Sequence, residues 1–209
     1  QYQQEPLPRE GNLVRTAWFK TYSPDELDRN FDAIVASWDT ASAANDNNDF
    51  SVGSIFGVSE DRYYLLRVYR ERLEYPALRR RILEANRRHG VGRVLLEWAD
   101  SGRNLYNDLV ELDGRGRYRV VKPKGSKEDR LAASSAVIEG GRVYLPEAAD
   151  WLPAFIREVT GFPNTRHDDQ VDSLSQFLNY MRRKPGGRLK LGSEGRLKLE
   201  RKRLRPRHS

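Results

Sequence analysis

The pattern of apolar and polar positions predicts three strands near the start of a folded domain. The segments Phe31–Trp38, Ser51–Val58 and Arg62–Tyr69 are short β-prone runs separated by polar, turn-rich residues. Strands joined by short polar turns favour an antiparallel meander.

Beyond these strands the pattern changes to helices alternating with strands. Helices are expected over Tyr75–Arg88, Leu105–Leu112, Ser126–Glu139, Ala148–Thr160 and Asp168–Arg183, and strands over Arg93–Trp98, Tyr118–Val121 and, briefly, Arg142–Leu145. A meander followed by such units predicts an α/β fold with a mixed sheet, antiparallel at the front and parallel behind, flanked by helices.

The same pattern divides the chain into three parts. Residues 1–27 are polar and interrupted by prolines, which is typical of an arm or linker and not of a core element. Residues 28–183 form the expected domain. Residues 184–209 are basic and lack a sustained period, so we expect this tail to be disordered in the absence of a ligand.

Charge adds a weak indication of a polyanionic partner. The net charge is +7, from 37 Lys and Arg against 30 Asp and Glu. The excess is concentrated in residues 182–209, and the rest of the chain is close to neutral. Nucleic-acid binding and a merely solvated basic tail explain this distribution equally well.

The residue types present restrict the chemistry. There is no cysteine, so thiolate metal sites and disulfides are excluded, and any metal must bind oxygen or one of the 3 histidines. Oxygen ligands favour hard ions such as Mg²⁺ or Mn²⁺. The chain has no signal-peptide pattern and no apolar run long enough to span a membrane, so we expect a soluble intracellular protein without a membrane partner.

Acidic residues occur where separate elements are expected to end or begin. Asp39 follows the first strand, Glu97 lies in the apolar strand VLLEW, and Asp168, Asp169 and Asp172 crowd the start of the last helix. A nuclease that uses two metal ions needs carboxylates that converge from separate elements in this way.

Each acid also has a structural explanation. Asp39 and Thr40 are typical of a turn, and aspartates in the first turn of a helix cap free amides and complement the helix dipole. Glu97 is harder to explain, because a carboxylate on a buried strand is costly unless it is paired or bound to a metal. The set as a whole therefore favours a metal site without identifying its substrate.

Other polar residues are weaker candidates. His167 precedes the aspartate pair and is a candidate to orient a carboxylate, although a surface histidine is equally expected. Lys122, Lys124 and Lys127 surround the turn at Gly125, and with Arg130 they are candidates to meet phosphates or to be solvated. Asp49 is a further candidate near the site, whereas Asp46 is expected to be solvated. No Walker-type phosphate loop, GxSxG elbow or HExxH motif is present.

Five segments, in this order, resemble the C-terminal nuclease domain of phage terminase large subunits. They are SWDTA (Ser37–Ala41), NDFSVGSIFG (Asn48–Gly57), LLEWADSG (Leu95–Gly102), KEDRLAASSAVIEGGRVYLP (Lys127–Pro146) and RHDDQVDSLSQFL (Arg166–Leu178). The opening QYQQEPLPREGNLVR is similar to the junction that follows the ATPase domain in that family.

The resemblance implies an RNase H-like fold and a metal-dependent endonuclease that cuts concatemeric viral DNA during genome packaging. By position, the metal-binding acids would be Asp39, Glu97 and the Asp168–Asp169 pair, with Asp169 as the preferred bridging ligand. Asp168 would help Asp169, and Asp172 would support the set. His167 and Asp49 are further supporting candidates from the residue pattern alone. Two Mg²⁺ or Mn²⁺ ions per site are implied.

The partners implied are double-stranded DNA, the ATPase domain, the small terminase subunit and the portal, in the cytoplasm of the infected bacterium. The ATPase domain itself is not part of this sequence, which lacks a Walker A loop. The alternatives are another RNase H-like nuclease, such as a junction resolvase or a transposase core, and a non-catalytic module that docks on DNA or the portal.

Overall fold

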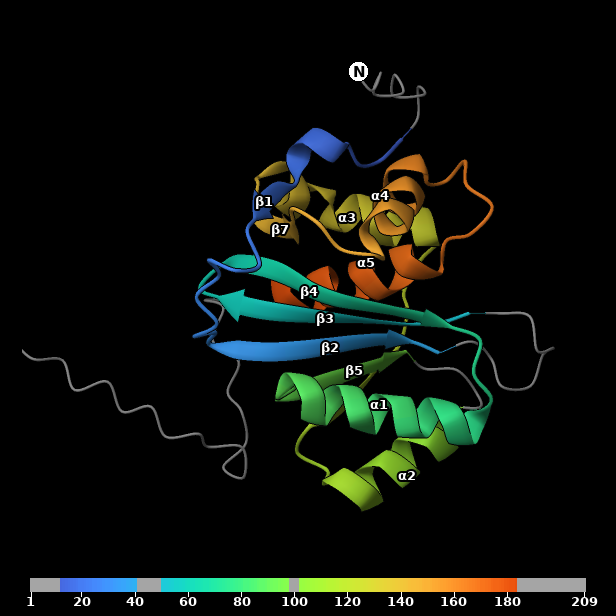
Figure 1. Ribbon diagram of the computed structural model, residues 1–209. Coiled ribbons are helices and arrows are strands. Elements are labelled where there is room, and N and C mark those ends of the chain that lie inside the picture. The colour runs from blue at the N-terminus through green and yellow to red at the C-terminus, as the bar shows by residue number, and fades with distance from the viewer. Residues whose placement is uncertain (1–11, 41–49, 98–101, 184–209) are drawn as a thin grey trace, which may run out of the picture.

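The computed structural model describes residues 12–40, 50–97 and 102–183, which form a mixed sheet with helices on both faces (Figure 1). The 7-stranded sheet has the order β1-β7-β4-β3-β2-β5-β6. Its strands are β1 (Lys20–Tyr22), β2 (Ala33–Asp39), β3 (Ser51–Ser59), β4 (Arg62–Glu71), β5 (Arg93–Glu97), β6 (Tyr118–Val121) and β7 (Val143–Pro146). The helices are α1 (Tyr75–His89), α2 (Gly102–Asp113), α3 (Lys127–Glu139), α4 (Leu152–Gly161) and α5 (Asp169–Arg182), and a short 3-10 turn covers Thr16–Trp18.

The strand directions confirm the predicted mixed sheet. The β2, β3 and β4 strands pair antiparallel as a meander. The remaining strands pair parallel, β5 on β2, β6 on β5, β7 on β4 and β1 on β7. A meander extended on both sides by parallel strands is the arrangement that the sequence pattern indicates.

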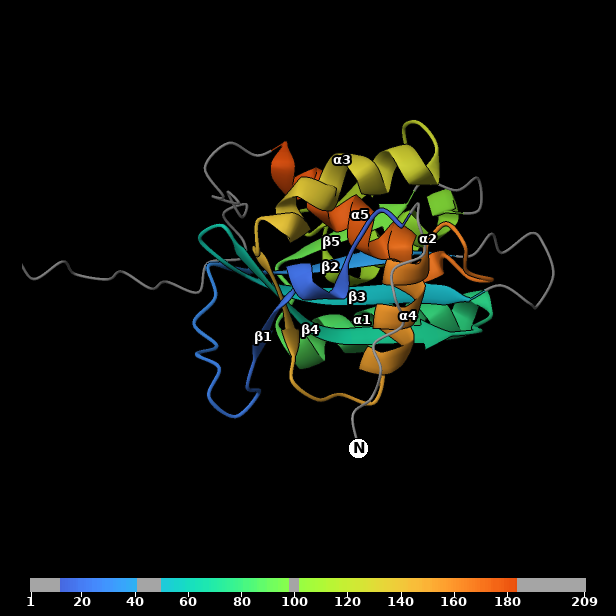
Figure 2. The ribbon, with the colours of Figure 1, turned by 90° about the horizontal axis from the view of Figure 1, so that it is seen from above.

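Helices cover the two faces of the sheet unequally. The α1 and α2 helices lie on one face, and α3, α4 and α5 lie on the other (Figures 1 and 2). Residues of α5 from Gln170 to Leu178 are all buried, because the helix is enclosed between the sheet and the α3 and α4 helices. A helix buried on all sides tolerates polar residues only where they are hydrogen bonded, and this condition becomes important at the site described below.

The start of the chain corrects one expectation. Residues 1–27 are not all an arm outside the core, because β1 pairs with β7 and the side chains of Val14 and Phe19 are buried in the core that contains α4 and α5. The strand has only 3 residues and no apolar alternation of its own. Its position depends on β7, far along the chain, which local pattern cannot reveal. Residues 1–11 and 184–209 lie outside the described residues.

Two other boundaries differ from the pattern by more than two residues. The α2 helix begins at Gly102, before the expected Leu105, and α4 begins at Leu152, after the expected Ala148. Pro153 lies in the first turn of α4, where a missing N–H and a fixed φ favour helix initiation. No helix among the described residues is long and apolar enough to cross a membrane.

The glycine at position 53 makes room for the largest side chain of the core. A Cβ at Gly53 would lie 2.5 Å from the ring of Trp38, which stacks on Tyr69. We expect Gly53→Ala to lower the free energy of unfolding by about 1–3 kcal/mol, since overpacking displaces a rigid ring. Urea unfolding measures the loss. Gly116→Ala is the control, because a Cβ there has no atom within 4 Å, and an equal effect of both variants would contradict the explanation.

Candidate active site

The strands β2 and β5 bring Asp39 and Glu97 together at one end of the sheet. These strands are parallel, with Ser37 opposite Leu95 and Trp38 opposite Leu96. The next residue on each strand is therefore Asp39 and Glu97. Leu95 packs in the core on the α5 side of the sheet and Leu96 in the core on the α1 side, so two-residue alternation turns Glu97 toward α5. The same alternation on β2 turns Asp39 toward α5.

Helix α5 is fastened to this end of β2 by polar side chains. The hydroxyl of Ser173 donates to the carbonyl of Ser37 at 2.8 Å and contacts the hydroxyl of Ser54 at 2.8 Å. The amide of Gln176 donates to the hydroxyl of Ser37 at 3.0 Å and to the carbonyl of Trp38 at 3.2 Å. Since Asp172 directly precedes Ser173, these bonds hold its carboxylate beside the end of β2.

Asp172 is the most deeply buried acid at this end of α5. Its side chain is 3% exposed, against 23% for Asp169 and 37% for Asp168. Both of its oxygens are bound by cations: Oδ1 by Arg130 at 2.5 Å and Oδ2 by the ammonium of Lys127 at 2.7 Å. Lys127 also contacts Asp168 at 2.6 Å. Both cations come from the start of α3, where a capping box between Ser126 and Asp129 fixes the first turn.

Burial and mutual repulsion raise the pKa values of the acids on the strands. The pKa of Asp39 lies well above its usual value, first because of burial and then because of the charges of Glu97, Asp172 and Asp169, while Lys127 opposes the shift. Burial also raises the pKa of Glu97, and the charge with the largest effect on it is that of Asp172. Asp172 is thus the helix acid that acts electrostatically on both strand acids.

Asp169 belongs to a second group of charges beside the first. Burial raises its pKa, and Arg70, whose guanidinium lies 3.7 Å from the carboxylate, opposes the rise. Arg70 also approaches the buried carboxylate of Glu158, at 3.8 Å. The guanidinium of Arg70 lies 3.6 Å from the ring centre of Phe50, and the guanidinium of Arg72 lies 4.1 Å from the same ring centre.

Glu158 was not identified from the sequence, yet it anchors the start of α5. Its carboxylate accepts the backbone N–H and the side-chain amide of Gln170, each at 2.6 Å. The side chain of the N-cap residue Asp168 makes no capping hydrogen bond to this helix. Glu158, which belongs to α4, instead accepts a hydrogen bond from one of the free backbone amides of α5. An acidic residue between the apolar residues of FIREV was the only sequence signal, and it names no partner.

We expect Glu158→Ala to lower the free energy of unfolding by about 1–3 kcal/mol, because the mutation leaves buried donors of Gln170 without an acceptor. Urea unfolding in EDTA measures the change. Glu147→Ala removes an exposed carboxylate as a control. Equal stability of the two variants would show that Glu158 does not anchor α5.

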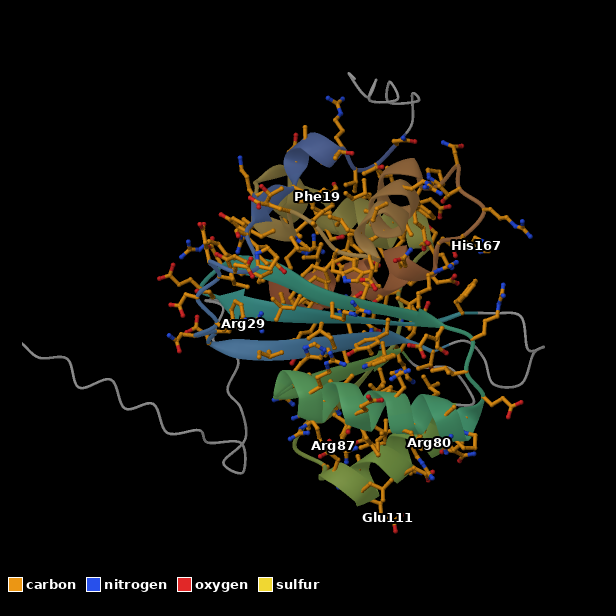
Figure 3. All side chains as sticks on the ribbon, viewed as in Figure 1. Phe19, Arg29, Arg80, Arg87, Glu111 and His167 are labelled. Carbon is orange, nitrogen blue, oxygen red and sulfur yellow. The ribbon has the colours of Figure 1, made fainter. Side chains whose placement is uncertain are left out.

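The other residues that the sequence predicts for the site lie in several places around the acids. His167 is exposed at the end of the sheet toward which β2 and β5 point (Figure 3), with its ring edge-on to Phe50, and its charge lowers the pKa of Asp169. Lys122 and Lys124 are exposed in the loop after β6, whereas Lys127 and Arg130 are engaged with the acids. Asp49 lies outside the described residues, as does Asp46.

The donor chemistry fits a hard divalent cation. The side chains that converge here offer carboxylate oxygens, and burial, together with neighbouring carboxylates, raises the pKa values of Asp39, Glu97 and Asp169. Within the described ranges, no three Asp, Glu or His side chains already form a metal-ligand cluster. The ammonium of Lys127 is instead the cation in contact with Asp168 and Asp172.

Residues 36–181 match the family model described as the terminase RNaseH-like domain. This range includes both strand acids, the whole of α5 up to Met181 and the two cations from α3. No curated protein matches the chain.

Solved structures share the fold. The large terminase nuclease from the thermophilic phage G20c with bound cobalt aligns with a TM-score of 0.61 and 15% identity, over 82% of this chain and 98% of that one. The same nuclease with bound magnesium gives 0.53 and 18%, over 77% and 84%. The large terminase of a second thermophilic bacteriophage gives 0.55 and 12%, over 78% of this chain, which spans 44% of that protein. The predicted RNase H-like fold is thereby confirmed.

Proposed function

Because this chain belongs to the family of terminase RNaseH-like domains, we propose that it is a divalent-metal-dependent endonuclease domain that cuts viral DNA. The likeness to the solved nucleases establishes the fold, and the proposal of activity depends on the acids of this chain. Phosphodiester cleavage by such folds needs several carboxylates that converge from separate elements.

One observation carries the proposal: β2, β5 and α5 bring Asp39, Glu97 and Asp172 to the same end of the sheet. There the charges of Glu97 and Asp172 raise the pKa of Asp39, and the charge of Asp172 raises the pKa of Glu97. A stable fold gains nothing from bringing acids together unless a cation compensates them. The metals bound by the G20c nuclease, cobalt, zinc and magnesium, agree with this chemistry.

We assign metal binding to Asp39, Glu97 and Asp172. The resemblance implies Asp169 as the third ligand, but Asp172 is the acid of α5 whose charge raises the pKa of both strand acids. Asp168 and Asp169 flank this set and are held by Lys127 and Arg70. Mg²⁺ or Mn²⁺, two ions per site, would lower the pKa of an attacking water and stabilise charge on the phosphate.

The cations around the acids position the site. Arg130 and Lys127 bind opposite oxygens of Asp172 and fix its orientation. The hydrogen bonds to Asp168 and Asp172 raise the pKa of Lys127 despite its burial, so its ammonium remains charged. When the acids are compensated by metal, this ammonium becomes available to a phosphate oxygen of the DNA backbone.

The wider setting follows from the family. The large terminase of the second phage, of which this chain spans 43% to 44%, was solved with ATP-gamma-S and with ADP. We propose that this domain works beside such an ATPase domain, with the small terminase subunit and the portal as further partners, in the cytoplasm of the infected bacterium. Contacts mainly to phosphate predict low sequence specificity and an affinity that falls steeply with salt.

A plasmid assay tests the activity. Supercoiled plasmid and a linear duplex are incubated with the protein in Mg²⁺, in Mn²⁺ and in EDTA. We expect cleavage of both substrates with metal and none in EDTA. Cleavage confined to four-way junctions would indicate a resolvase, and DNA binding without cleavage under any condition would indicate a docking module.

A further inference from the structure

A groove begins at Glu97 and leads away from the acids along the edge of the sheet. One wall is β6, the last strand of the sheet, with the loop that follows it; the other is formed by α3 and the C-terminal half of α5. The groove encloses about 650 Å³. Its position gives it direct access to the candidate active site, because Glu97 pairs with Val121 of β6.

Cationic side chains dominate the groove. It is lined by Arg119, Lys122, Lys124, Arg130, Arg182 and Arg183, against the acids Glu97 and Asp129. All of these cations except Arg130 are exposed. Lys124 and Arg183 take no part in the ion pairs of Asp168 and Asp172. A groove lined by exposed cations and ending at an acid of the candidate site is complementary to a chain of phosphates whose reacting member lies at the acids.

The lining of the groove also includes apolar side chains. Val120, Val121, Pro123 and Tyr180 lie among the cations. A duplex presents its phosphates outward and keeps its bases stacked inside, so its base faces could not reach these side chains. An unpaired strand offers both phosphates for the cations and base faces for apolar and aromatic side chains.

We propose that this groove binds one unpaired strand of the DNA where it continues from the cleavage site. The inference rests on the proposed function, since it takes the acids as the place where the strand is cut. It adds Arg119, Arg182, Arg183 and Tyr180 to the residues that contact DNA. It also means that the duplex opens beside the site, with one strand held along β6.

Binding of a labelled oligothymidine about ten nucleotides long tests the groove. Fluorescence anisotropy is measured in EDTA, where no cleavage occurs, over a series of salt concentrations, for the wild type and for Lys124→Ala/Arg183→Ala. Loss of two phosphate contacts should weaken binding at low salt and reduce the slope of log K against log salt by about 1.4.

The matched control is Arg80→Ala/Arg87→Ala, which removes the same charge from exposed positions on α1, on the other face of the sheet (Figure 3). We expect it to leave the slope unchanged. Equal slopes for the wild type and the groove variant would overturn the proposal. So would an equal loss of affinity for a blunt duplex, because a duplex would then be the ligand.

The binding proposal for the groove and the proposal of nuclease activity can be rejected independently of each other. The oligothymidine assay needs neither metal nor catalysis, whereas the plasmid assay needs both. Plasmid cleavage together with an unchanged salt slope would reject the groove alone. Absence of cleavage together with the expected slope change would reject the nuclease and remove the cleavage site from which the strand is taken to continue.

Discussion

Asp39→Asn is expected to reduce metal-dependent plasmid cleavage on the order of 10³-fold, which corresponds to roughly 4 kcal/mol of transition-state stabilisation. Asp39 ends β2, beside both Glu97 and Asp172, so it is the acid best placed to share a metal with each of them. The asparagine keeps the size of the side chain and removes its charge. Rates of nicking in Mg²⁺ and Mn²⁺ provide the measurement.

The same variant should be more stable than the wild type when metal is absent. The pKa of Asp39 in the folded state lies above its usual value of 3.8, so the folded protein binds the proton more tightly than the unfolded chain. The free energy of unfolding therefore falls as pH rises from about 4 through the folded pKa, and the penalty is complete only above that folded pKa. Asp39→Asn removes its part of this penalty.

Urea unfolding in EDTA, from acidic to neutral pH, measures whether the free energy of unfolding falls as the pH rises. We expect a weaker pH dependence for the variant, and a smaller increase in Tm than the wild type shows when Mn²⁺ is added. Asp61→Asn, at an exposed position in the turn between β3 and β4, is the matched control and should behave as the wild type. Cleavage by Asp39→Asn at the wild-type rate would contradict the assignment.

Local pattern predicted most of the fold, because most elements carry their own signals. The α1 helix has Pro76 in its first turn and Gly90 at its end, where φ is +63°, and both are standard boundary signals. The β6 strand is observed with the expected bounds, Tyr118–Val121. By contrast, β1 lies at the edge of the sheet with β7 as its neighbouring strand, and a pairing partner far along the chain leaves no local trace.

The candidate acids on the strands were predicted for the same reason, and the structure places them at one end of the sheet. Asp39 and Glu97 were identifiable because carboxylates at the ends of apolar strands require an explanation. The sequence could not show which acid of α5 lies beside the strand acids, since Asp168, Asp169 and Asp172 all lie near the first turn of the helix. It depends on how Ser173 and Gln176 fasten the helix to β2, and such contacts between distant elements have no sequence signature. The anchoring of α5 by Glu158 is of the same kind.

Neutralising each acid of α5 separately distinguishes the structural assignment from the sequence-based one. The four proteins to compare are the wild type, Asp168→Asn, Asp169→Asn and Asp172→Asn. Asparagine retains an oxygen that accepts hydrogen bonds, which limits the damage to the contacts with Lys127, Arg130 and Arg70. Because breaking a buried ion pair costs about 3–5 kcal/mol, circular dichroism and Tm in EDTA must first show that Asp172→Asn is folded.

We expect Asp172→Asn to reduce cleavage by about 10²–10³-fold and to abolish the increase in Tm on addition of Mn²⁺. Asp168→Asn should retain cleavage within about tenfold of the wild type, because Asp168 is the most exposed of the three and its charge is not among those that shift the pKa of Asp39 or Glu97. The charge of Asp169 raises the pKa of Asp39 but is not among those that shift the pKa of Glu97. The cleavage rate of Asp169→Asn should therefore lie between those of the other two variants. If Asp169→Asn abolishes cleavage while a folded Asp172→Asn cuts normally, the bridging ligand is Asp169, and the buried contacts of Asp172 with Lys127 and Arg130 serve only to hold α3 against α5.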